Sequence, residues 1–191
     1  MKPAERRTLA AVQAELDRLI RYDDQSVVHD RWIRQRYSCG CYPTLAPARA
    51  ASVRTAWHEA GHAVAALAVG APFSSASIHH GRGSEGRVHG ISGGGGLAFV
   101  IDAGGQVAER LMNWTMLDTD ANLRQWLQGW RADGGDARRF RAGAAGDEVA
   151  AWRYAEGVLT PRRLAVRQVA RALLVAPRHL PYPVVAAIAA S

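Results

Sequence analysis

Apolar residues recur at three- and four-residue steps through most of the chain, and this spacing predicts a mainly helical protein. Two short segments, 76–80 and 87–91, read instead as strands joined by the glycine-rich turn GRGSEG, which is typical of a β-hairpin. The expected fold class is therefore mainly α, with a small β-hairpin or sheet. The expected helices cover residues 4–22, 53–69, 97–114 and 120–130, a short segment opened by Asp136, and one or two helices between 148 and 176, interrupted near Thr160–Pro161.

A stretch from residue 38 to 51 contains one glycine and two prolines and is expected to form a loop. We therefore divide the chain near residue 46, into an N-terminal helical extension with its linker, 1–45, and a main domain, 46–191. In the main domain, Ser52 is a suitable N-cap for the first helix, and Gly70 ends that helix.

Two features inside the expected helices concern packing. Gly104 and Gly105 each cost a helix about 1 kcal/mol relative to alanine, so we expect them to allow another helix to approach closely. Trp126 and Trp130 lie on the apolar stripe of the helix at 120–130, which indicates core packing rather than ligand stacking.

The formal net charge of +7 would suit a nucleic-acid partner, but the charge is not gathered into a recognition motif. The basic residues are arginines spread along the chain, except for Lys2. We therefore expect no specific nucleic-acid partner, although a regulatory protein that binds DNA through its arginines remains an alternative. Because a Walker-A loop needs a lysine after its glycines, the chain carries no ATPase site of that type.

Location and redox state follow from simple patterns. No run approaches the roughly 18 to 20 apolar residues that span a bilayer, and the charged N-terminus lacks the apolar core of a signal peptide, so we expect a cytoplasmic protein. Cys39 and Cys41 are separated by one residue, which is a poor spacing for a disulfide, so free thiols are expected. A metal site that uses both cysteines with His29 is the alternative.

The segment His58-Glu59-Ala60-Gly61-His62 carries the clearest chemistry. Residues four apart on a helix share one face, so both imidazoles can bind one metal ion. Glu59 is offset by one position, which keeps its carboxylate off the metal but close to a metal-bound water. Zinc lowers the pKa of such a water to about 7, so the pattern indicates peptide-bond hydrolysis with Glu59 as general base. An ordinary helix that happens to carry two histidines is the alternative.

The stretch TAWHEAGHAVAALAVG resembles the zinc-binding helix of the FtsH family of ATP-dependent metallopeptidases. SASIHHGRGSEGRVHG is similar to the strand and glycine-rich turn that follow it in that family, and IDAGGQVAERL resembles the next helix, where we expect Glu109 to have a structural or ligand-supporting role. The stretch from AWRYAEGVL to VVAAI is like the closing helix. The resemblance covers about residues 50–190 and only the peptidase part of the family, without the ATPase module or the membrane anchor.

In that family the third zinc ligand is an aspartate well downstream of the motif. Its best match is GGDARRFRA, which implies Asp136, 74 residues beyond His62, with Asp133, Asp118 and Asp120 as competitors. Two departures from the family are a shorter segment after Asp136 and an alanine, rather than a leucine, next to it. The resemblance thus implies a Zn²⁺ site formed by His58, His62 and Asp136.

We therefore expect a zinc-dependent endopeptidase that acts on polypeptides and has no ATPase of its own. Its substrate would be a flexible segment or a chain delivered by a separate unfoldase or adaptor. A non-catalytic binding or regulatory module with the same fold is the alternative. His79, His80 and His89, beside the expected hairpin, are predicted to face solvent, with contact to a substrate strand as the alternative.

Overall fold

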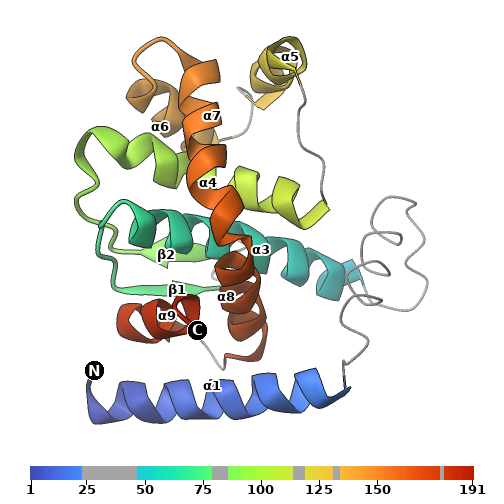
Figure 1. The fold of residues 1–191 in the computed structure, drawn as a ribbon, viewed down its shortest axis with the longest axis vertical. Coiled ribbons are helices and arrows are strands. Elements are labelled where there is room, and N and C mark those ends of the chain that lie inside the picture. The colour runs from blue at the N-terminus through green and yellow to red at the C-terminus, as the bar shows by residue number, and fades with distance from the viewer. Residues whose placement is uncertain (23–46, 79–85, 114–118, 131–133, 177–178) are drawn as a thin grey trace.

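The computed structural model describes residues 1–22, 47–78, 86–113, 119–130, 134–176 and 179–191, and it is mainly helical (Figure 1). The predicted fold class is thus confirmed. The helices are α1 (Pro3–Tyr22), α3 (Pro47–Ala68), α4 (Ala98–Asn113), α5 (Asp120–Trp130), α6 (Gly134–Gly143), α7 (Glu148–Leu159), α8 (Arg163–Val175) and α9 (Tyr182–Ala189). Single 3₁₀ turns, Gly95–Leu97 and Thr160–Arg162, precede α4 and α8, and the second is the predicted interruption.

Helix α3 forms the centre of the core, packed between α4 and α8. Its buried positions are mostly small, including Ala56, Ala60 and Ala63, so the neighbouring helices can come close. A Cβ added to Gly61 would lie 2.1 Å from the carbonyl oxygen of Gly104 on α4. The prediction that the interior glycines serve a close helix approach is therefore confirmed at Gly104.

The start of α3 was predicted wrongly. The helix begins at Pro47, so Ser52 lies inside it and residues 47–51 are not a loop. Proline is tolerated in the first turn because its missing N–H would have no partner there, so the same residue that indicates a loop can also open a helix. The predicted end is close to the observed one, since Gly70 follows the helix with a φ of 70°.

A three-stranded antiparallel sheet lies beside α3, in the order β2-β1-β3. Strands β1 (Ser75–Ser77) and β2 (Arg87–His89) form the predicted antiparallel pair, with Ala76 opposite Val88. They are shorter than predicted, and the turn at 79–85 lies outside the described residues. The third strand, β3 (Leu180–Pro181), was not predicted, because two residues carry no alternation.

The remaining helices enclose this centre. Helix α1 packs against α8 and α9, at the bottom of the view in Figure 1, and buries Val12 there. Between α5, α6 and α7, ring centroids lie 4.7 Å apart for Trp126 and Trp152 and 5.3 Å apart for Trp130 and Phe140. The tryptophans of α5 therefore pack in the core, as predicted.

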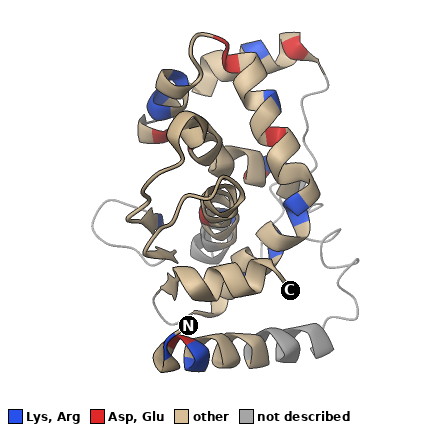
Figure 2. Ribbon diagram, turned by 60° about the vertical axis from the view of Figure 1, so that its left-hand side comes forward, with Lys and Arg blue, Asp and Glu red and all other residues tan. Residues whose placement is uncertain are grey.

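Acidic residues are interspersed with basic ones along the described helices (Figure 2). Arg153, for example, forms ion pairs with Asp120 at 3.2 Å and with Glu156 at 2.8 Å. Part of the arginine charge is thus balanced within the fold. No helix in the described part of the chain is long and apolar enough to cross a membrane.

Candidate metal centre

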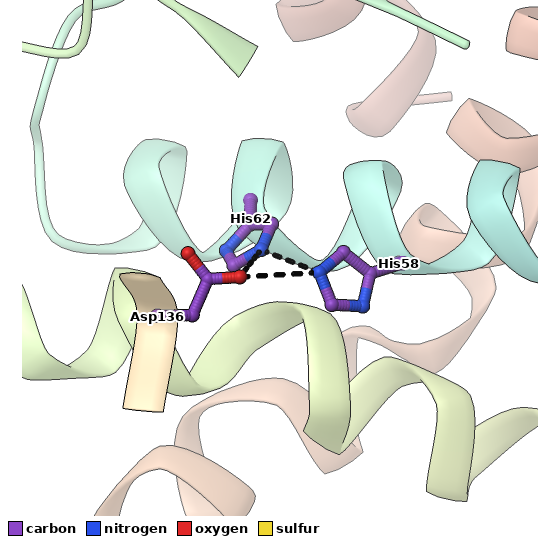
Figure 3. A group of neighbouring side chains, drawn as sticks. All are labelled: His58, His62 and Asp136. Carbon is purple, nitrogen blue, oxygen red and sulfur yellow. Dashed lines mark hydrogen bonds and ion pairs between the residues drawn. The ribbon is translucent and has the colours of Figure 1, made fainter. Parts of the chain in front are cut away.

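Helices α3 and α6 bring three side chains of metal-binding type together. His58 and His62 come from adjacent turns of α3, and Asp136 comes from the first turn of α6 (Figure 3). Their ligand atoms all lie within 4.8 Å of one another. Of the three competing aspartates, Asp120 pairs with Arg153. Asp118 and Asp133 lie outside the described residues.

The spacing of these atoms fits a small cation. Oδ2 of Asp136 lies 3.4 Å from Nε2 of His58 and 3.3 Å from Nε2 of His62, and the two Nε2 atoms are 3.0 Å apart. Ligand atoms at roughly 2.0–2.1 Å from one tetrahedral ion lie about 3.3 Å from each other. Two imidazole nitrogens and one carboxylate oxygen also leave a fourth position open, as in catalytic zinc sites.

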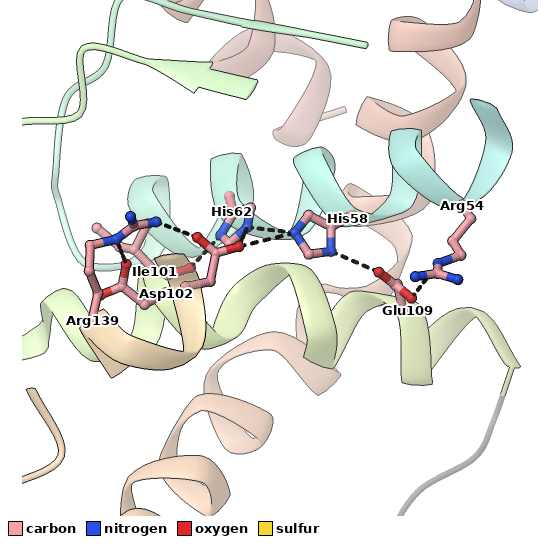
Figure 4. Close-up of polar contacts among 8 residues, drawn as sticks. Arg54, His58, His62, Ile101, Asp102, Glu109 and Arg139 are labelled. Atoms are coloured by element: carbon pink, nitrogen blue, oxygen red, sulfur yellow. Dashed lines mark hydrogen bonds and ion pairs between the residues drawn. The ribbon is translucent and has the colours of Figure 1, made fainter. Parts of the chain in front are cut away.

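Helix α4 holds both imidazole rings in place. Nδ1 of His58 lies 2.8 Å from Oε1 of Glu109, and Nδ1 of His62 lies 2.6 Å from the carbonyl oxygen of Ile101 (Figure 4). Because each Nδ1–H donates to an acceptor on α4, each Nε2 is free to bind a metal. Arg54 in turn fixes the Glu109 carboxylate, at 2.9 Å. Glu109 thus contacts His58, as expected of a residue with a structural or ligand-supporting role.

Gly105 lies on the same face of α4, one turn from both Ile101 and Glu109. A Cβ at this position would lie 2.5 Å from Cε1 and from Nε2 of the His58 ring. This second interior glycine therefore makes room for the ring of His58, in addition to the helix contact at Gly104.

The second oxygen of Asp136 has partners that the sequence did not reveal. Oδ1 of Asp136 accepts a hydrogen bond from Nη2 of Arg139, one turn along α6. Nε of Arg139 donates to Oδ1 of Asp102 on α4 at 2.7 Å (Figure 4). Both residues lie in stretches quoted for the resemblance, but neither was singled out. Only the three-residue spacing between Asp136 and Arg139 on a helix could have suggested one of these contacts.

The ligands also alter one another's proton affinity. Burial lowers the pKa of His58, but its hydrogen bonds with Asp136 and Glu109 outweigh burial and raise the pKa to about 9. Burial raises the pKa of Asp136, but hydrogen bonds with His58 and His62 hold that pKa well below its usual range. Without a metal the site therefore holds a proton on His58 beside an ionised Asp136, and a cation that binds there must displace this proton.

Glu59 is not among the three candidate ligands, but its carboxylate interacts electrostatically with His58, His62 and Asp136. Its side chain is buried at the start of β2, where a Cβ on Gly86 would lie 2.8 Å from Oε1 of Glu59. Burial raises its pKa, against opposing effects of His62, His58 and a hydrogen bond from the backbone N–H of Val88. A carboxylate whose pKa is raised is a stronger proton acceptor than an ordinary carboxylate, as a general base requires.

The site has been described so far from its own contacts, without reference to known proteins. No protein-family model matches the chain, and no curated protein matches it significantly. The resemblance to FtsH peptidases therefore stays a prediction, and the evidence on function is the geometry of the side chains.

The other singled-out residues lie elsewhere. His89 is exposed on β2, as predicted, with Nε2 3.4 Å from Oγ of Ser77. His79, His80, Cys39, Cys41 and His29 lie outside the described residues.

Proposed function

We propose that the chain is a zinc-dependent endopeptidase, similar to the peptidase part of the FtsH family, with Glu59 as its general base. The observation that best supports the proposal is the meeting of His58, His62 and Asp136 at one point, with Glu59 beside them and outside the ligand set. A bound zinc ion would supply the Lewis acid, which polarises the substrate carbonyl and lowers the pKa of water.

Each residue then has a distinct task. His58, His62 and Asp136 bind the ion, while Glu109 and the Ile101 carbonyl orient the imidazole rings. Glu59 takes the proton from the attacking water and passes it to the leaving amine. The hydrogen bond from Val88 holds the Glu59 carboxylate against β2, so this acceptor is positioned before a substrate arrives.

The sequence also bears on the kind of polypeptide that the proposed enzyme would cleave. Because the only lysine in residues 1–191 is Lys2, these residues contain no Walker-A site. We therefore propose that the substrate is an already flexible polypeptide in the cytoplasm, or one that a separate unfoldase or adaptor delivers.

The proposal is tested by metal analysis and by cleavage of casein, a flexible substrate. Wild-type protein is expected to carry one zinc ion and to cleave casein. Glu59→Gln should retain the zinc, since Glu59 is not a ligand, and should lose activity by about 10²- to 10⁴-fold, the usual contribution of a general base. Glu5→Gln, the same change on α1, is the matched control and should remain active.

Two results would change the assignment. Cleavage by Glu59→Gln at the wild-type rate would remove Glu59 from the reaction. A wild-type protein that holds zinc but cleaves neither casein nor unfolded peptides would support the alternative, a non-catalytic binding or regulatory module.

A further inference from the structure

We propose that Asp102 and Arg139 form a positioning pair that holds Asp136 with a single oxygen turned toward the metal. The proposal rests on the metal site of the proposed function and adds two residues that act on a ligand without touching the ion.

The two oxygens of Asp136 have separate partners. Oδ2 is the atom that lies 3.4 Å from Nε2 of His58 and 3.3 Å from Nε2 of His62. Oδ1 is held by Nη2 of Arg139, on the same helix. Rotation of the carboxylate would break the contact with Arg139, so the arginine selects one-oxygen binding and leaves the remaining position of the ion open.

Asp102 completes the arrangement in two ways. It anchors Arg139, whose side chain is 56% exposed, through a 2.7 Å hydrogen bond to a carboxylate that is 14% exposed. It also cancels the arginine charge, which would otherwise repel a cation in the site. With Asp102 included, α4 orients all three ligands: His62 through Ile101, His58 through Glu109, and Asp136 through Asp102 and Arg139.

The experiment is a double-mutant cycle on zinc affinity. Asp102→Asn, Arg139→Gln and the double variant are compared with wild type by competition with a chromophoric chelator. Asp102→Asn should weaken zinc binding by about 10- to 100-fold, the range for groups that support a metal ligand. In the Arg139→Gln background the same change should cost less than about threefold, because Asp102 acts through Arg139.

Two further measurements separate positioning from general damage to the fold. The visible absorption spectrum of the cobalt-substituted protein should change in Asp102→Asn, because the ligand geometry at Asp136 changes. Arg138→Gln, which removes the same charge from an exposed neighbour on α6, should leave both affinity and spectrum as in wild type. Thermal unfolding of the metal-free variants checks that each is folded at the assay temperature.

The proposal is overturned if Asp102→Asn leaves zinc affinity and the cobalt spectrum unchanged, or if its effect is equally large with and without Arg139. These outcomes are distinct from a failure of the proposed function. A wild-type protein that binds zinc without cleaving peptides would contradict the proposed peptidase activity. The zinc affinities of the four proteins in the cycle could still be compared.

Discussion

Replacing Gly105 with alanine places one methyl group directly against the ring of His58. The added Cβ would lie 2.5 Å from two ring atoms, whereas ordinary contact begins near 3.4 Å, so the ring must move by about 0.9 Å. It cannot do so freely, because Glu109 holds its Nδ1 at 2.8 Å. Metal–ligand distances tolerate only about 0.2 Å of error, so we expect zinc affinity to fall by roughly 100-fold.

The same substitution should affect folding much less. Alanine gains about 1 kcal/mol of helix propensity over glycine, while overpacking costs about 1–3 kcal/mol, so the net loss of unfolding free energy is between about 0 and 2 kcal/mol. Gly157→Ala in α7 is the matched control, because a Cβ there meets no atom within 4 Å. It should stabilise the protein by up to about 1 kcal/mol and leave zinc affinity unchanged.

Chelator competition and urea unfolding of the metal-free protein measure the two quantities separately. Zinc affinity of Gly105→Ala within twofold of wild type would refute the reasoning, since it would show that the ring can shift without cost to metal binding. A large loss of stability with unchanged affinity would likewise place the strain in the helix contact rather than at His58.

Three further predictions concern the core and the metal-free site. Gly61→Ala should cost at least about 3 kcal/mol in urea unfolding, because its Cβ would meet backbone atoms of Gly104; a neutral effect would contradict the close packing. Trp152→Ala should cost about 4 kcal/mol by the same measurement, since it empties a fully buried site and removes the 2.7 Å partner of Glu156; a loss under 1 kcal/mol would exclude it from the core. The pKa of about 9 for His58 lies above its unfolded value, so the metal-free protein should lose up to roughly 3 kcal/mol of stability between pH 6.5 and 9, and His58→Gln should flatten this pH dependence.

Local patterns accounted for most of the helices and for the first two ligands. Helical periodicity placed α5 at its observed bounds, because its buried residues recur every three or four positions. The four-residue spacing of His58 and His62 was enough to put both rings on one face. Asp136 could not be derived from spacing, since it lies on a different helix, and only the resemblance indicated it.

Features that depend on long-range packing were not predicted from the sequence. Asp102 and Arg139 meet only because α6 packs on α4, and although both lie in stretches that resemble the FtsH family, neither residue was singled out there. Helix α9 is apolar on nearly every side and so shows no period, although three of its residues, Val184, Val185 and Ile188, are buried. Strand β3 exists only as a partner for β1 and has no signal of its own.

The pairing of β1 with β3 has a consequence for how the protein is made. Ser75 in the central strand lies opposite Pro181, a residue synthesised 106 positions later. Strand β2, which packs on Glu59, is attached to that same central strand. On the ribosome, a nascent chain that has emerged only as far as α8 would therefore have all three candidate ligands but an incomplete sheet beside them. The three-stranded sheet beside the candidate metal site is therefore complete only after translation has passed residue 181.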